Sequence, residues 1–111
     1  MPSWEDVRRI ALALPGAEES TSYRQPCFKV NGRPFVNVSR EAGAISTRAS
    51  DEEVELLVAA RPDAYFVTPH YRGWEAVLVR LDAVDDEELA GRIEDSWEYM
   101  SRKKRLRKRQ R

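Results

Sequence analysis

Residues 26–38, Pro-Cys-Phe-Lys-Val-Asn-Gly-Arg-Pro-Phe-Val-Asn-Val, predict a β-hairpin. Phe28 and Val30 occupy alternate positions, which is the pattern of a strand with one face toward a core. Asn31-Gly32 follows, and this pair favours the two-residue hairpin turn because both residues tolerate a positive φ. Residues 35–38 continue the period of two, so two antiparallel strands are expected on either side of the turn.

Further strands follow from the same reasoning. Glu-Ala-Gly at 41–43 is a second turn, and 44–47 make the third strand of a meander. Residues 65–68 and 74–81 are rich in β-branched and aromatic side chains and predict two more strands. The polar stretch 18–22 is interpreted as a connector, so five strands are expected.

Three segments show apolar residues at helical spacing: 3–14, 51–60 and 85 to about 101. Ser50 and Asp85 are N-caps with Glu53 and Glu88 at the third helical position. The side chains expected to pack against the sheet are Trp4, Ile10, Leu57, Leu89, Ile93 and Trp97. The predicted fold is α+β: a two-layer structure of order α-β-β-β-α-β-β-α, in which three helices cover one face of a five-stranded antiparallel sheet.

The 111 residues suffice for one domain, assigned to 1–101, followed by a basic C-terminal tail at 102–111. Residues 1–100 hold 11 basic and 19 acidic side chains, a formal charge of −8. Residues 101–111 hold eight basic side chains and no acidic ones. The formal net charge of zero therefore conceals an acidic body with a strongly basic end.

Several classes of protein are excluded by the sequence. No apolar run reaches the ~18 residues of a membrane span, and acidic residues stand where a signal peptide needs basic ones, so a cytoplasmic protein without a membrane partner is expected. Cys27 is the single cysteine and His70 the single histidine, which excludes an internal disulfide and a four-ligand zinc site. No cofactor motif or metal-ligand spacing occurs, and the acidic runs at 52–53 and 85–88 are explained as helix caps.

Two segments are candidates for nucleic-acid binding. The basic tail attracts polyanions independently of sequence. The loop at 68–74 places aromatic rings and a guanidinium close together, groups that stack on bases and contact phosphates. The candidate binding residues are Arg102, Lys103, Lys104, Arg105, Arg107, Lys108, Arg109 and Arg111 in the tail and Tyr71, Arg72 and Trp74 in the loop.

Each candidate has a structural alternative. The tail is also explained as a frayed helix end whose cations interact with the helix dipole, or as a segment that docks on the acidic body. In the loop, Pro69 and Gly73 would shape a strand connection, with Trp74 in the core and Arg72 solvated.

Four segments resemble the MmcQ/YjbR family: LALPGAEE at 12–19, PCFKVNGRPF at 26–35, TPHYRGWEAV at 68–77 and SW at 96–97. The resemblance implies a two-layer fold similar to type III secretion chaperones. It also implies DNA binding, the function with which the family is commonly labelled, and by analogy of fold a homodimer.

The leading hypothesis is therefore a non-enzymatic protein that binds DNA or another nucleic acid through its basic tail. The alternative is a chaperone-like or protein-interaction module. An enzyme built on Cys27 and His70 ranks third, because neither residue has an activating neighbour in the sequence.

Overall fold

The Asn31-Gly32 turn joins β2 (Gln25–Val30) to β3 (Arg33–Val38) in the computed structural model. Both residues have the positive φ that this turn requires, 54° at Asn31 and 79° at Gly32. The structure describes residues 2–22, 25–39, 41, 43–71 and 73–109, except for the side chains of residues 22, 70 and 103–109. The hairpin predicted from the sequence is confirmed and forms the centre of one half of the sheet.

The described strands form one antiparallel sheet of order β1-β2-β3-β4-β6-β5. The sheet therefore has six strands where the sequence predicted five. The strands besides β2 and β3 are β1 (Ala17–Ser22), β4 (Ala44–Arg48), β5 (Tyr65–Phe66) and β6 (Ala76–Arg80). The two strands expected at 65–68 and 74–81 are real but shorter, and two short 3-10 helices, η1 (Pro69–Tyr71) and η2 (Leu81–Ala83), flank β6.

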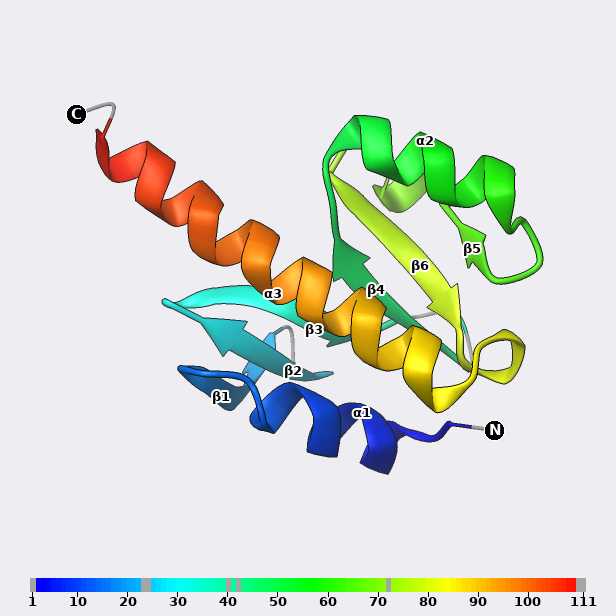
Figure 1. Cartoon of the computed structure of the whole chain (residues 1–111), viewed down its shortest axis with the longest axis horizontal. Coiled ribbons are helices and arrows are strands. Elements are labelled where there is room, and N and C mark those ends of the chain that lie inside the picture. Colours follow the sequence, from blue (N-terminus) through cyan, green and yellow to red (C-terminus); the bar gives the residue numbers. More distant parts are fainter. Residues whose placement is uncertain (1, 23–24, 40, 42, 72, 110–111) are drawn as a thin grey trace.

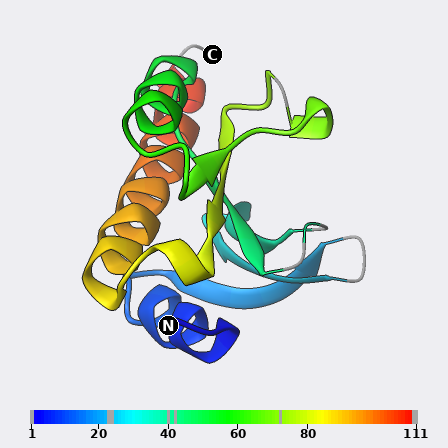
Figure 2. The same cartoon turned by 90° about the vertical axis from the view of Figure 1, so that its right-hand side faces the viewer.

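Three helices, α1 (Trp4–Leu12), α2 (Asp51–Ala60) and α3 (Asp86–Arg109), lie on one side of the bent sheet, while η1 lies on the other (Figures 1 and 2). The α+β class and the two-layer arrangement are confirmed. Leu89 and Ile93 of α3 are fully buried, whereas Trp4, Ile10, Leu57 and Trp97 are partly buried around the same core. None of the helices in the described part of the chain combines the length and apolar character needed to cross a membrane.

Strand β1 is the element that the sequence pattern does not reveal. The polar character of residues 18–22 predicts a connector, yet β1 pairs with β2 from Ala17↔Val30 to Ser22↔Gln25. It is an edge strand, and Glu19 on its helix-facing side is paired with Arg8 of α1 at 3.0 Å. Because an ion pair takes the place of an apolar contact there, no hydrophobic alternation marks the strand.

The end of α3 also differs from the prediction. The sequence predicts an end at about residue 101, but the helix continues to Arg109, so the basic residues of 102–109 extend the last helix. No Gly or Pro follows Met100 to stop it. We call this segment, residues 102–109, the basic extension.

Two polar side chains of α3 attach it to the middle of β3 and to the end of β4. The buried Ser96 Oγ donates to the carbonyl of Phe35 at 2.6 Å and accepts from the backbone N–H of Arg48 at 2.8 Å. Arg92, 4% exposed, donates through Nη2 to the carbonyl of Arg48 at 2.9 Å and through Nη1 to Glu53 of α2 at 3.3 Å. We call Ser96 and Arg92 the α3 clamp, because together they hold both backbone polar groups of one β4 residue.

Replacing Ser96 with Ala should destabilise the protein by about 2 kcal/mol, because loss of a partner inside the protein costs ~1–3 kcal/mol per buried polar group. Glu94→Ala, at an exposed position of the same helix, is the matched control and should stay within about 0.5 kcal/mol of the wild type. Urea unfolding monitored by circular dichroism measures both. Equal midpoints for the two variants would contradict the role given to the clamp.

Candidate nucleic-acid interface

The loop between η1 and β6 is held in a fixed conformation. The N–H of Trp74 donates to the carbonyl of Tyr71 at 3.1 Å, and Arg48 Nη1 donates to the carbonyl of Trp74 at 2.9 Å. The N–H of Ala49 in turn donates to the carbonyl of Glu75 at 3.0 Å. Glu75 has a φ of 56°, a conformation that L side chains rarely adopt, so these contacts hold a locally strained turn.

The turn presents an aromatic side chain at the surface. Trp74 is 50% exposed, and its ring meets that of Tyr71 edge to face, with centroids 6.2 Å apart and planes at 74°. The expectation that Trp74 fills the core was therefore wrong. Arg72 lies outside the described residues, as does the side chain of His70, whose backbone is part of η1.

Tyr99 of α3 connects this loop to the base of the basic extension. Burial, together with a hydrogen bond to the Glu75 carboxylate, raises the pKa of Tyr99 to about 12. Burial also lowers the pKa of Arg48, an effect that the neighbouring Glu75, Tyr71 and Tyr99 oppose. Glu75 of the loop and Tyr99, three positions before the first basic residue of the tail, are thus neighbours.

The basic extension begins just past this junction. Met100, 3% exposed, is the last side chain of α3 that the structure shows buried, and Arg102 is exposed. At 1.5 Å per residue, the nine residues that follow Met100, up to Arg109, carry the helix about 14 Å farther, and Figure 1 shows this end projecting from the body. The side chains of the other tail candidates, Lys103, Lys104, Arg105, Arg107, Lys108, Arg109 and Arg111, lie outside the described part of the structure.

The face of the sheet opposite the helices, which we call the open face, is defined by strand register. One cross-strand row on this face runs across all six strands: Ser20, Cys27, Asn37, Ser46, Leu78 and Phe66. The neighbouring row, with Phe28, Val36 and Val77, belongs to the core under the helices. Lys29, Arg48 and Arg80 alternate with the core residues and so share the open face.

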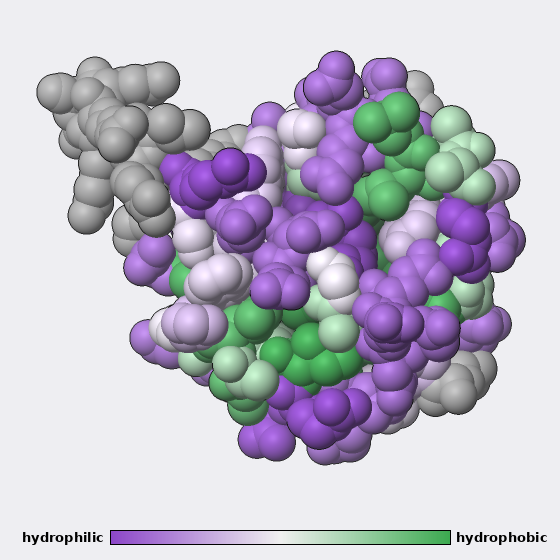
Figure 3. Space-filling model, in the orientation of Figure 1, coloured by the Kyte–Doolittle hydropathy of each residue, from purple (hydrophilic) through white to green (hydrophobic). Residues whose placement is uncertain are grey.

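The charges of the body are divided between its two sides. Twelve of the nineteen acidic residues lie on the three helices, and strands β2 to β6 contain none. Figure 3 shows hydrophilic side chains over most of the helix-bearing face. Glu18, opposite Lys29 on the edge strand, is the acidic residue of β1 that the register places on the open face. Apart from the basic extension, the three helices carry three basic side chains, Arg8, Arg9 and Arg92, so the open face differs in charge from this acidic side of the body.

Family and fold comparisons agree with this architecture. The family model YjbR matches residues 12–99. The chain belongs to the YjbR family. Uncharacterised proteins of Mycobacterium tuberculosis and Mycobacterium bovis are each 31% identical to it over 112 residues, which cover 87% of either chain. The crystal structure of a Deinococcus radiodurans protein with a DUF419 domain superposes with a TM-score of 0.74 over 87% of this chain and 77% of that one; at 24% identity it shows the shared fold alone.

The YjbR match separates the two candidate segments. It includes the loop with Tyr71 and Trp74 and ends at residue 99, three positions before the first cation of the basic extension. The mycobacterial relatives are uncharacterised, so they assign no role to any residue. The loop belongs to the part that this chain shares with the YjbR family, whereas the extension lies beyond it.

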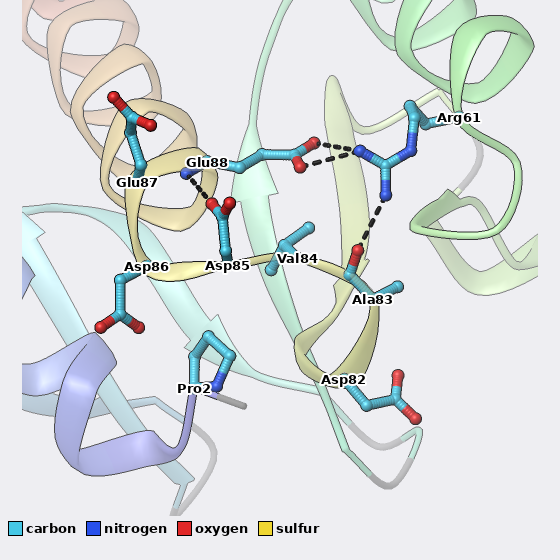
Figure 4. A pocket seen from close by; sticks show the side chains of 9 residues that line it. All are labelled: Pro2, Arg61, Asp82, Ala83, Val84, Asp85, Asp86, Glu87 and Glu88. Atoms are coloured by element: carbon cyan, nitrogen blue, oxygen red, sulfur yellow. Dashed lines mark hydrogen bonds and ion pairs between the residues drawn. The ribbon is translucent and has the colours of Figure 1, made fainter.

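A surface depression near the start of α3 is explained by helix capping and ion pairing (Figure 4). Asp85 accepts from the N–H of Glu88 at 2.8 Å, which confirms the predicted cap. Glu88 receives two bonds from Arg61 Nη1, at 2.8 and 3.0 Å, and one from the Tyr65 hydroxyl at 2.7 Å. Arg61 also donates to the carbonyl of Ala83 at 2.8 Å. Among the described residues, no group of acidic, His or Cys side chains is arranged to hold a metal ion.

Cys27 lacks the environment of a catalytic thiol. Its side chain is fully buried, and burial raises the pKa of the thiol, whereas a nucleophilic cysteine requires an accessible group with a lowered pKa. Sequence reasoning also overlooked Arg48 and Tyr99, which position the loop. Arg48 is the last residue of a strand, and Tyr99 lies beside the apolar stripe of α3. Neither position shows a sequence pattern that predicts a long-range contact.

The junction predicts a specific pH dependence. The pKa of Tyr99 is about 12 in the folded protein against an ordinary value of 10. Between pH 10 and 12 the unfolded protein therefore loses the Tyr99 proton, whereas the folded protein keeps it. The stabilisation is present below pH 10 and is lost as the pH rises toward 12. Tyr99→Phe should therefore lose stability less steeply over this range, as measured by urea unfolding at stepped pH.

The pKa of Tyr65 is also raised, by burial and by its hydrogen bond to Glu88, but Tyr65 is present in the wild type and in the Tyr99→Phe variant alike. The difference between their slopes therefore isolates Tyr99. Parallel pH curves for wild type and Tyr99→Phe would mean that the Tyr99 hydroxyl does not hold the loop.

Proposed function

We propose that the protein binds nucleic acid, DNA included, through the phosphate backbone and without enzymatic activity. The observation that carries the proposal is the continuation of α3 as a helix through Arg109. Seven of the eight residues in the basic extension are Lys or Arg. A helix that projects such a density of cations away from an acidic body is suited to neutralise several phosphates at once.

One acidic segment of the body, the first turn of α3, lies too far from the extension to compete with an external partner. The acidic first turn of α3, Asp86-Glu87-Glu88, lies at the opposite end of the helix from the basic residues. The 24 residues of α3 correspond to about 36 Å, so the two ends of this helix do not pair with each other within one chain. We assign Tyr71, Arg72 and Trp74 to the same interface, and we expect a cytoplasmic location, where nucleic acid is accessible.

A chain that ends at Met100 tests the proposal. It should remain folded, because the described buried stripe of α3 ends at Met100, and it should lose binding to duplex DNA, because the remaining body carries a charge of −8. Circular dichroism checks the fold, and fluorescence anisotropy with a labelled duplex checks binding. In the intact chain, log K should fall with log salt at a slope of about −7 if all eight basic residues contact phosphates.

A matched variant keeps the length of the chain. Replacing Lys103, Lys104 and Lys108 with Gln should reduce the salt slope by about 3, at ~0.9 per phosphate contact. Full binding by the shortened chain would move the site to the loop. Absence of binding by the intact chain at low salt would reject the proposal.

The alternative function is a protein-interaction or chaperone-like module, including association with a second copy. The exposed apolar side chain of Leu56, 66% accessible on α2, favours it. This alternative becomes the better one if the intact protein binds no nucleic acid in the experiment above.

A further inference from the structure

Trp74 is an unusual side chain to leave at a surface. Half of its area is exposed, although a tryptophan side chain would gain considerably from burial. The surrounding contacts do not bury it. Instead, the Arg48 and Tyr71 hydrogen bonds fix its backbone, and the Tyr71 ring fixes its orientation from the side. An aromatic ring held in this way is preorganised for contact with another planar group.

The open face continues from this ring with cations and a second aromatic side chain. The exposed Arg80 places its guanidinium 4.1 Å from the centroid of the Phe66 ring, and Lys29 is half-buried on the other half of the same face. The side chains between them, Cys27, Ser46 and Leu78 among them, are buried, so the centre of this face is covered and its accessible groups lie toward the edges. The accessible groups on this face are therefore mainly cationic, amide or aromatic.

We infer that the nucleic acid bound by this protein is single-stranded, with a base stacked on Trp74 and with phosphates on the basic extension and on the cations of the open face. The inference rests on the proposed function and adds the class of ligand. Aromatic stacking requires an unpaired base, because bases inside a duplex are already stacked on each other. Arg48 contacts Ser96 of α3 through its backbone and the carbonyl of Trp74 through its side chain, which places the aromatic turn near the part of α3 that leads into the extension, so one flexible strand reaches both.

Glu75 and Glu18 limit where the phosphates pass. The Glu75 carboxylate accepts from Tyr99 and faces Arg48, so its charge is partly balanced. Glu18 lies opposite Lys29 at the β1 edge. Arg80, at the far side of the face and next to Phe66, is therefore the cation best placed to contact a phosphate.

The test compares a single-stranded oligonucleotide with a duplex of the same length, both of about 20 nucleotides, longer than the ~4–16 nucleotides that one OB fold, a common single-strand-binding domain, covers. Trp74→Ala should weaken single-strand binding by between about 5- and 150-fold, the range for loss of one base stack, and should leave duplex binding within about 2-fold. Trp74→Phe, which retains a ring, should restore most of the affinity. Deoxyribose and ribose versions of the strand distinguish DNA from RNA as the preferred source.

A second pair of variants tests the open face without altering the aromatic turn. Arg80→Gln should weaken single-strand binding several-fold and reduce the salt slope by about 0.7, the value for one phosphate contact of a single strand. Arg9→Gln removes the same charge from an exposed position of α1 on the helical side and is the matched control, expected to change neither quantity measurably. Unfolding midpoints confirm that the variants are folded.

The outcomes separate the two proposals. If the intact chain binds neither single strands nor duplex, the nucleic-acid function itself is rejected. If it binds duplex as tightly as single strands, or if Trp74→Ala affects both equally or neither, nucleic-acid binding stands and the single-strand inference is overturned. The single-strand inference is likewise overturned if Arg9→Gln weakens binding as much as Arg80→Gln.

Discussion

The attachment of α3 to the end of β4 determines how the rest of the structure is arranged. Ser96 and Arg92 take up both backbone polar groups of Arg48, so neither the helix nor the strand can shift without exposing a buried hydrogen-bonding group. The backbone of Arg48 is fixed in this way, and its side chain donates a hydrogen bond to the carbonyl of Trp74 that holds the aromatic turn. One residue thus transmits the position of the helix to the loop on the other side of the sheet.

The sequence predicted those elements whose signals are local. The Asn31-Gly32 turn and the Asp85 cap each depend on residues within four positions, and the stripe through Leu89 and Ile93 lies on one helix. Strand β1 could not be found this way, since its residues 18–22 are all polar and Glu19, on the side that faces the helices, pairs with Arg8. The exposure of Trp74 depends on Arg48, 26 residues earlier in the chain, and no local pattern reports such a contact.

The distribution of charge gives the fold a direction. The acidic residues gather on the helices, where first-turn carboxylates cap helix ends and interact favourably with the helix dipole. Strands β2 to β6 contain no acidic side chains, so the open face is less negatively charged than the rest of the body. The formal neutrality of the whole chain is therefore the sum of differently charged surfaces, and a single isoelectric point describes none of them.

Helix α3, with carboxylates in its first turn and cations in its last, makes the whole molecule an electric dipole that runs opposite to the peptide dipoles of its longest helix and outweighs them. In the field of a polyanion such a molecule rotates before contact, so the basic end leads and the acidic body trails. This orientation acts on the association rate more than on the lifetime of a complex. It fades once ions screen the field, over roughly 8 Å at physiological salt. The continuity of α3 therefore affects the rate at which the protein associates with a polyanion.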